Sequence, residues 1–367
     1  MIINLLDPGL SVIGGHHLEW DRLIAAELSA QGHGVTIYSH LGIAPETRAA
    51  LGAGAKLVPL FRNYAYLHPQ QLDPVAGELM GFIDVAVALA EDLRAVAQAD
   101  LWLWPSLFHA QLYACSLIRP EVVISGCIHT EPEFMSSQGA ACWRYAFIKA
   151  GQAGLRLNIG VPGPVLQQEY DALFGSRQLV QLLPLPNPGH PCDTPRTELK
   201  TIGFFGHQRQ EKGAANVPAL ISALLNEGYE VVLHDSGNAF GSEQVPGLTR
   251  VGYVPDLAAE IARCDLVVVP YEAKSYRSRE SAIVWDALAS GVPVVVPNGT
   301  APGLRVLTSG AGKVFHFPTV ESIRQAIGEA RMGYHEIAAA AFRTSRKWRE
   351  TQGVARLTQA LIADVRS

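Results

Sequence analysis

The sequence predicts an α/β protein of two domains, each built on a parallel β-sheet with helices on both faces. Continuous apolar runs of strand length alternate with segments of helical periodicity along most of the chain, as buried parallel sheets require. The 367 residues are enough for two domains of ordinary size. Five prolines and one glycine in residues 183–198 break the alternation, and this segment is predicted to link the domains.

The first half of the chain contains the strands and helices of one such domain. An apolar strand is predicted at residues 1–7, and helical spacing follows over residues 16–32. Further strands are predicted, with helical segments between them, at residues 34–40, 55–61, 100–106, 121–129, 155–161 and 180–186. Residues 101–118 contain no Asp, Glu, Lys or Arg, but Pro105 and the short length favour a buried strand, a turn and a buried helix over a membrane span.

The second half repeats the alternation after the proline-rich segment. Strands are predicted at residues 201–206, 229–235, 248–254, 265–271 and 293–297, and helices at 214–228, 256–264, 281–291 and from about Thr319 onward. Asp256 is the expected N-cap of its helix. The predicted bounds are 1–195 for a first Rossmann-like domain, 196–345 for a second domain facing it across a cleft, and 346–367 for a C-terminal helix that packs back toward the first.

Composition and charge exclude several classes of function. The net charge of −5 is a poor match to a protein that binds nucleic acid by neutralising phosphates. Residues 1–195 carry 10 Lys and Arg against 17 Asp and Glu, whereas residues 196–367 carry 19 against 17, so the second domain is the expected host of an anionic ligand. Five scattered cysteines lack metal-ligand spacing and favour a reducing cytoplasm. The N-terminus lacks the basic start of a signal peptide.

Ligands of open α/β sheets bind beyond the carboxyl ends of the strands, so the loops that follow strands are the candidate sites. The first such loop contains Gly14 and Gly15, directly before the first helix. Glycines let a ligand approach the backbone, and a helix N-terminus attracts an anion. The spacing is not G-x-G-x-x-G, so the NAD fingerprint is absent. A Gly-Gly pair on its own is better explained as a simple turn.

The second loop is "GFFGHQRQEKG", residues 203–213. A predicted strand ends there, and His207, Arg209 and Lys212 follow before Gly213 opens the next helix. Three cationic side chains near a helix N-terminus could clamp a diphosphate. The pattern does not fit a Walker A loop. A solvated basic loop explains this stretch alone equally well.

The third loop and its helix lie in residues 267–297. The helix is apolar except for Asp286, and burial of an unpaired charge is costly, so this carboxylate needs a partner. The vicinal hydroxyls of a ribose are suitable partners, as they are for the acid of a Rossmann domain. Pairing with Arg277 or Arg279, or a place on a solvated face, are the structural alternatives.

Together these loops resemble retaining glycosyltransferases of the GT-B fold, in the large group called group 1 or family 4. The resemblance is densest over residues 201–300. It rests on "GFFGHQRQEKG", on "VGYVPDLAAEIARCDLVVVPY", on "WDALASGVPVVVP" and on the N-terminal "GGHHLEWDRLIAAELSAQGHGVTIYS". The resemblance spans the whole chain at the level of fold, while strong motifs cover about a third of it. It implies transfer from a nucleotide sugar and says little about which sugar.

The resemblance also implies roles for residues of the basic loop and of the base-binding loop. Lys212 matches the lysine that holds the donor diphosphate. His207 stands where the family has an arginine, and Arg209 could supply the missing guanidinium. Tyr253 and Val254 fall where the base usually packs.

Other donor-binding roles follow from the third loop and from the glycine pair. Asp286 matches the second acid of the family's paired glutamates, which holds the ribose. The first acid would fall at Ser278, and Glu280 is the nearest carboxylate. Ser281 and Ala282 match the helix N-terminus that meets phosphate. Gly14 and Gly15 match the loop beneath the donor phosphates and sugar.

Candidates on the first domain are fewer. His129 ends a predicted strand, at the place where some relatives have a histidine near the donor sugar, and it joins Arg209 and Lys212 as a predicted catalytic residue. His17 and Glu19 could face an acceptor hydroxyl. Buried structural histidines are common, and a surface position on the first helix is the alternative for the acceptor-side pair.

The predicted function is therefore transfer of a sugar from a nucleoside diphosphate sugar to an acceptor hydroxyl with retention of configuration. The predicted pathway is glycan biosynthesis. Arg209, Lys212 and His207 would stabilise the departing diphosphate, so neither a metal nor another cofactor is expected. The acceptor is a glycan, a lipid-linked molecule or a small molecule, and no nucleic acid partner is expected. The protein is predicted to be cytoplasmic, with at most peripheral contact with the inner face of the membrane.

Two rival functions share this architecture. A nucleotide-sugar epimerase would need carboxylates placed for acid/base catalysis. Glu131 and Glu133 are the only candidate pair. A non-catalytic sugar-nucleotide binder would explain why His207, Ser278 and Asp286 depart from the family pattern.

Overall fold

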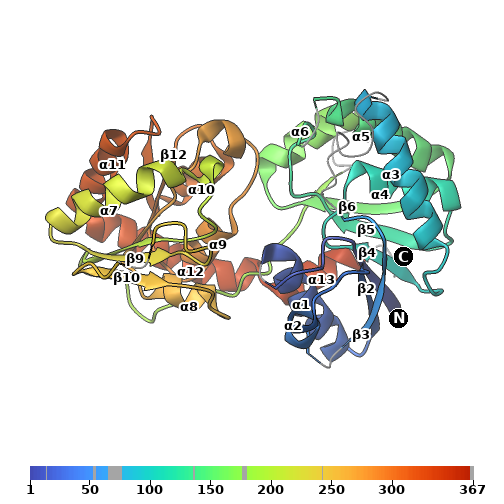
Figure 1. The fold of residues 1–367 in the computed structure, drawn as a ribbon, viewed down its shortest axis with the longest axis horizontal. Coiled ribbons are helices and arrows are strands. Elements are labelled where there is room, and N and C mark those ends of the chain that lie inside the picture. Colours follow the sequence, from blue (N-terminus) through green and yellow to red (C-terminus); the bar gives the residue numbers. More distant parts are fainter. Residues whose placement is uncertain are drawn as a thin grey trace. The chain divides into compact units, whose positions relative to one another are not determined.

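The computed structural model describes residues 1–13, 15–52, 55–64, 77–134, 137–175, 180–241 and 243–363. The chain forms two compact units, one of Met1–Pro186 with Val354–Ser367 and the other of Asn187–Gly353. The boundary after Pro186 lies inside the proline-rich segment that the sequence predicts as a linker. Each unit contains one parallel sheet (Figure 1).

In the described residues of the first unit, the sheet has seven strands in the order β3-β2-β1-β4-β5-β6-β7. The strands are β1 (Ile2–Asp7), β2 (Gly34–His40), β3 (Lys56–Phe61), β4 (Leu101–Trp104), β5 (Val123–Cys127), β6 (Arg156–Val161) and β7 (Gln181–Leu182). Neighbouring strands pair in parallel throughout. The strand order reverses between β1 and β4.

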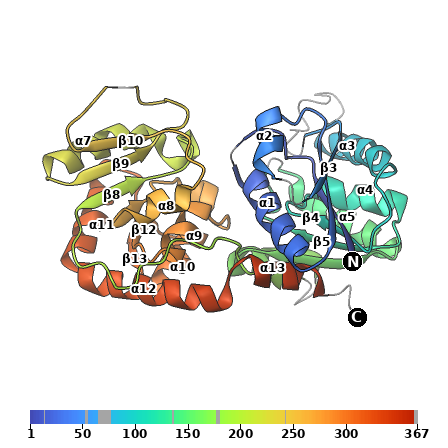
Figure 2. The same cartoon turned by 90° about the horizontal axis from the view of Figure 1, so that it is seen from below.

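Helices cover both faces of this sheet (Figures 1 and 2). They are α1 (Gly15–Ala30), α2 (Pro45–Ala50), α3 (Gly77–Leu93), α4 (His109–Ile118), α5 (Gly139–Gln152), α6 (Pro164–Phe174) and α13 (Val354–Leu361). Helices α3, α4 and α5 lie on one face, over a core that includes Trp104, Trp143 and Tyr170. Helices α1 and α13 pack together on the other face.

Helix α13 is therefore part of the first unit, although it lies at the far end of the sequence. The side-chain amide of Asn158, on β6, donates hydrogen bonds of 3.0 Å to the carbonyl oxygens of Ala360 and Leu361. The amide of Gln31 donates to the hydroxyl of Thr358 at 3.2 Å. The two bonds from Asn158 satisfy carbonyl groups at the C-terminal end of α13, which have no partners within the helix.

In the described residues of the second unit, the sheet has six strands in the order β10-β9-β8-β11-β12-β13. The strands are β8 (Thr201–Phe204), β9 (Glu230–His234), β10 (Leu248–Val251), β11 (Leu266–Val268), β12 (Val294–Pro297) and β13 (Gly312–Phe315). The helices are α7 (Val217–Asn226), α8 (Leu257–Ala262), α9 (Ala282–Ala289), α10 (Ala301–Ser309), α11 (Val320–Met332) and α12 (Tyr334–Thr351). Helices α7 and α11 pack together, as do α8, α9 and α12 (Figure 1). The strand order reverses between β8 and β11.

Most predicted elements are confirmed, and the differences have local causes. Asp256 caps α8 as expected, because its side chain accepts a hydrogen bond from the amide of Ala259. Strand β11 ends at Val268 rather than at residue 271, since Pro270 cannot donate to the sheet. The sequence analysis missed α10 and β13. The segment 101–118 contains a strand and a separate helix, and no described helix is long and apolar enough to span a membrane.

Candidate functional site

Each sheet has one point at which its strand order reverses, and ligands of open α/β sheets bind in the crevice at such a point. In the second unit this point lies between β8 and β11, and in the first unit between β1 and β4. The residues that follow these four strands are therefore the structural candidates for a site.

Two glycines shape the loop that follows β8. Gly206 has a φ of +96° and Gly213 a φ of +74°, in the left-handed region that favours glycine. A Cβ at Gly213 would overlap the carbonyl group of Pro270, which follows β11. A Cβ at Gly206 would lie 3.3 Å from Nζ of Lys212. The loop therefore closes tightly onto the chain after β11, and Lys212 is placed at the switch point.

Lys212 is a cation in a partly desolvated position. Its ammonium lies 5.9 Å from the ring centroid of Tyr271, within the range of a cation–π contact. Burial, and to a smaller extent the nearby Arg209, lower the pKa of Lys212 to about 8, against the opposing charge of Glu211. A lysine held in this way stays mostly protonated at neutral pH. It would gain free energy from an anion, because an anion offsets the repulsion from neighbouring cations.

His207 and Arg209 belong to the same loop but are exposed. Arg209 precedes the short 3₁₀ turn that carries Lys212, and its guanidinium lies 3.9 Å from Oε1 of Glu211. His207 lies with Nδ1 3.4 Å from the hydroxyl of Ser236. Burial lowers the pKa of His207, and so do the charges of Lys212 and Arg209. The three cationic side chains of the prediction are thus close enough to repel each other.

The start of α9 contacts the same switch point. Ser281 is the N-cap of α9, and its hydroxyl accepts a hydrogen bond of 3.4 Å from the amide of Val284. The hydroxyl of Tyr271 lies 3.2 Å from that of Ser281, so the residue beside Lys212 also contacts the cap. Ala282, in the first turn, is exposed. The predicted phosphate-binding groups Lys212, Ser281 and Ala282 therefore lie on connected segments.

The two predicted acids of this region have protein partners. Glu280 is buried, and Arg305 holds its carboxylate through hydrogen bonds of 2.6 and 3.1 Å. The indole of Trp285 donates a third, of 3.1 Å. Asp286 accepts a hydrogen bond of 2.7 Å from the amide of Asn187. Glu280 thus connects the loop before α9 to α10. That Glu280 and Asp286 bind the sugar donor stays a prediction.

Tyr253 and Val254 follow β10, an edge strand of the second sheet. The side chain of Tyr253 is exposed, with 53% of its surface accessible, as a ring that stacks on a base would need. Val254 is half-buried beside it. Their contact with a base stays a prediction.

In the first unit, a buried carboxylate–imidazole pair occupies the corresponding switch point. Asp7 is the last residue of β1, and its Oδ2 lies 2.7 Å from Nδ1 of His17 on α1. The amide of Gly9 donates a 2.7 Å hydrogen bond to Oδ1 of Asp7. A Cβ at Gly9 would overlap the imidazole of His17. Glycine is therefore required at position 9 for His17 to lie against this turn.

Two further histidines lie beside this pair. The ring centroids of His16 and His17 are 4.1 Å apart, and those of His16 and His129 are 5.5 Å apart. Ser106, just beyond β4, has its hydroxyl 3.3 Å from Nε2 of His16. The carboxyl ends of β1, β4 and β5 therefore gather a cluster of polar side chains, which we call the histidine cluster: Asp7, His16, His17, Ser106 and His129.

His129 has protein partners on both ring nitrogens. Nε2 lies 2.8 Å from the carbonyl oxygen of Pro105, which can only accept, so Nε2 carries the hydrogen. Nδ1 lies 3.9 Å from the thiol of Cys127. Burial lowers the pKa of His129 to about 4, so the ring is neutral at physiological pH. The catalytic role predicted for His129 stays a prediction, and these contacts fit a ring that supports its neighbours.

The remaining predicted residues of the first unit have different outcomes. Gly14 lies outside the described residues, and Gly15 is the first residue of α1. Glu19 is exposed, and its carboxylate pairs with Arg22 at 2.7 Å. Of the acceptor-side pair, only His17 belongs to the histidine cluster.

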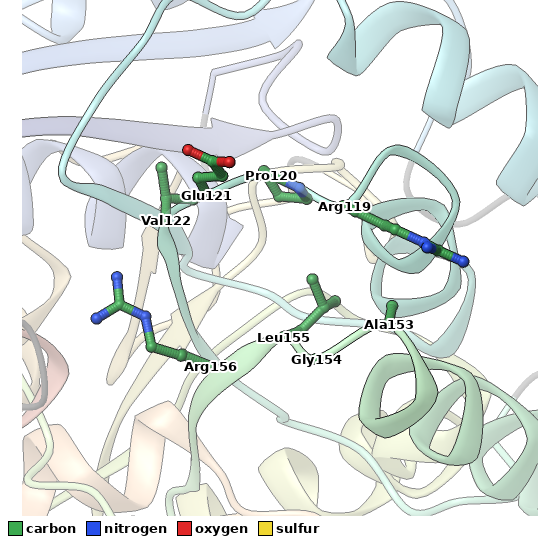
Figure 3. A pocket seen from close by; sticks show the side chains of 8 residues that line it. All are labelled: Arg119, Pro120, Glu121, Val122, Ala153, Gly154, Leu155 and Arg156. Atoms are coloured by element: carbon green, nitrogen blue, oxygen red, sulfur yellow. The ribbon is translucent and has the colours of Figure 1, made fainter.

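A cavity of about 270 Å³ lies elsewhere, at the amino ends of β5 and β6. Arg119, Glu121 and Arg156 are among the residues that line it. Figure 3 shows their charged ends pointing apart rather than toward a common point. Their arrangement does not suggest a site for one anion. Within the described part of the chain, no three His, Cys, Asp or Glu side chains are grouped as metal ligands.

The sequence analysis missed Asp7, Gly9 and Arg305. A signal existed for the first two, because "DPG" directly follows an apolar strand, and an Asx-type turn is common at that position. Arg305 lies 25 residues beyond Glu280, and no local pattern connects the two.

Comparison with protein-family models and with curated proteins gives no match. Solved structures do match. The glycosyltransferase SnogD from Streptomyces nogalater has 20% identity and a TM-score of 0.61, over 99% of this chain and 98% of that one. HepE from Anabaena, in complex with UDP, has 14% identity and a TM-score of 0.67, over 100% and 99%. The glycosyltransferase VinC, in complex with DTDP, has 16% identity and a TM-score of 0.62, over 100% of both chains. As predicted, this chain has the two-domain α/β architecture of the GT-B fold.

Proposed function

We propose that the protein transfers a sugar from a nucleoside diphosphate sugar to the hydroxyl group of an acceptor. This proposal rests on the position of Lys212. Its ammonium is a cation partly removed from water at the switch point between β8 and β11. His207 and Arg209 add positive charge to the same loop. Among the structures with this fold, one is bound to UDP and another to DTDP, and both ligands contain the diphosphate that such a site would attract.

The chemistry of transfer requires stabilisation of the negative charge that develops on the departing diphosphate. Preorganised cations and backbone amides supply this best when they are already in place before the reaction. The Gly213 turn and the contact with Tyr271 fix Lys212 in that way, and the capped start of α9 adds backbone amides. We propose that these groups act without a metal. If so, turnover will persist in excess EDTA, and loss of turnover restored by Mg²⁺ would contradict it.

The test is incubation with a panel of UDP-, DTDP-, GDP- and ADP-sugars, each with glycan, lipid-linked and small-molecule acceptors. The proposal predicts a glycosylated acceptor and one nucleoside diphosphate for each transfer. A change in the free nucleotide sugar that needs no acceptor would instead indicate an epimerase. Tight binding without turnover across the panel would indicate a non-catalytic binder.

For the stereochemistry we propose retention, on the resemblance of the basic loop and of the segment around Asp286 to retaining enzymes. One observation favours the alternative, inversion. Asp7 and His17 form the buried carboxylate–imidazole pair that in other enzymes orients a general base. An imidazole that deprotonates the acceptor directly would give a single displacement. The coupling constant of the anomeric proton in the product distinguishes the two outcomes by NMR.

We further propose that this activity is cytoplasmic and that any contact with a membrane is peripheral. All five cysteines are free thiols, and four of them are buried, as is usual in a reducing compartment. Fractionation of the native cells tests this. Recovery of the protein in the membrane pellet after a high-salt wash would contradict peripheral contact.

A further inference from the structure

A second carboxyl group, that of Asp21, is buried beside the Asp7–His17 pair, and nothing so far gives it a role. Asp21 lies on α1, one helical turn after His17, so both side chains occupy the same face of the helix. Its exposed fraction is 0%. Within the described residues, neither of its carboxyl oxygens receives a hydrogen bond from an N–H or O–H group.

An ionised carboxylate in this position would be costly. Removing a charge from water without a hydrogen-bond donor costs several kcal/mol, roughly, and a neighbouring like charge adds to that cost. Burial raises the pKa of Asp21 well above its ordinary range, and the nearby Asp7 raises it further. A carboxyl group that keeps its proton at this position is a hydrogen-bond donor.

Asp7 is the carboxylate of the two that accepts hydrogen bonds from neighbouring groups. Its Oδ1 accepts from the amide of Gly9 at 2.7 Å, and its Oδ2 lies 2.7 Å from Nδ1 of His17. Each carboxylate oxygen can accept more than one hydrogen bond, so Asp7 has capacity for a third donor.

We propose that Asp21 is a positioning residue, which donates a hydrogen bond from its carboxyl group to Asp7 and so holds the Asp7 carboxylate on Nδ1 of His17. Of the other titratable groups in the histidine cluster, His16 contacts Ser106, and His129 contacts the carbonyl of Pro105 and the thiol of Cys127. The proposal deepens the proposed function, and its kinetic consequence rests on the alternative in which His17 deprotonates the acceptor. Asp21 fixes the orientation of Asp7, Asp7 fixes the tautomer of His17, and Nε2 of His17 becomes the basic nitrogen.

Two substitutions distinguish the effect of the hydrogen bond that Asp21 donates from the effect of the space that its side chain fills. In Asp21→Asn, the side-chain amide can still donate to Asp7. In Asp21→Leu, a side chain of similar size cannot. With saturating donor and acceptor, Asp21→Asn should keep kcat within about twofold, whereas Asp21→Leu should lower kcat by roughly tenfold to a hundredfold, with little change in the donor KM. Asp84→Asn, which alters an exposed aspartate on α3, is the matched control and should change nothing.

Two further readouts do not depend on catalysis and use the full chain. A difference infrared spectrum of wild type minus Asp21→Asn at pH 7 should show the C=O band of a protonated carboxylic acid. In NMR spectra, the Nδ1–H signal of His17, assigned with His17→Gln, should persist in Asp21→Asn and be lost in Asp21→Leu. A single cooperative thermal unfolding transition in each variant would show that neither is simply misfolded.

The outcomes distinguish this inference from the proposed function. If wild type transfers no sugar, the proposed function fails, and the infrared and NMR spectra still decide the role of Asp21. The inference is overturned if the carboxylic acid band is absent, if Asp21→Leu keeps both the Nδ1–H signal and wild-type kcat, or if Asp21→Asn loses as much kcat as Asp21→Leu.

Discussion

Lys212 offers the most quantitative test of the nucleotide site. The substitution Lys212→Met removes the ammonium and keeps most of the length of the side chain. A hydrogen bond between charged groups contributes about 1.5–3 kcal/mol. Since 1.4 kcal/mol corresponds to a tenfold change, the Kd for a nucleoside diphosphate should rise by roughly 10-fold to 150-fold.

The pKa of Lys212 also predicts the direction in which nucleotide affinity changes with pH. Burial is the largest cause that lowers this pKa to about 8. An anion binds the protonated form better, so affinity is full below this pKa and falls as the pH rises through it. The protonated fraction drops about tenfold between pH 7 and pH 9, so the Kd of wild type should rise by up to about tenfold over that range. His207 cannot cause this, because its pKa is lowered from the ordinary histidine value.

The assay is isothermal titration with UDP, DTDP, GDP and ADP at pH 7, 8 and 9, at constant ionic strength. Lys200→Met is the matched control, since Lys200 is exposed, pairs with Glu198 and lies at the amino end of β8. The control should bind as wild type does. The reasoning is refuted if Lys212→Met binds like wild type, or if the wild-type Kd is flat from pH 7 to pH 9.

Three further predictions concern the glycines and Asp21. Gly213→Ala should lower the free energy of unfolding, measured in urea, by more than Gly228→Ala. Both positions have a positive φ, which costs roughly 1–2 kcal/mol, but only at Gly213 would the Cβ meet another group. Gly9→Ala should displace His17 and lower kcat without weakening nucleotide binding, and unchanged kcat would contradict this. Asp21→Asn should remove the contribution of this carboxyl group to the pH dependence of the free energy of unfolding. The folded chain holds a proton that the unfolded one loses near pH 4, so wild-type stability should fall by about 1.4 kcal/mol per pH unit above that point, until the raised pKa is reached.

The fold could be predicted from the sequence because its strands are fully apolar runs. Residues 2–7 and 294–297 form central strands covered on both faces, and such strands leave a strong signal. The proline-rich segment gave the approximate position of the boundary between the units. Strand β13 was missed because Gly312 and Lys313 interrupt its short apolar pattern, and its place beside β12 depends on pairing with Val294–Pro297.

The candidate site could be predicted only where one loop carries it. Residues 203–213 place their cations in one short stretch, so the sequence alone indicates them. The first unit differs, because the histidine cluster assembles from three strand ends and one helix. Asp21 looks like an ordinary polar position of an amphipathic helix, and only the packing of α1 on β1 shows that it is buried beside Asp7.

The central claim is that the protein transfers a sugar from a nucleotide donor, with Lys212 holding the diphosphate. The most direct measurement is the amount of nucleoside diphosphate released and of acceptor glycosylated, in the same reaction, for wild type and Lys212→Met. Wild type should give equal amounts of the two products. In Lys212→Met, turnover should be lower by about tenfold or more. Release of nucleotide without a glycosylated acceptor, or a Lys212→Met variant as active as wild type, would contradict it.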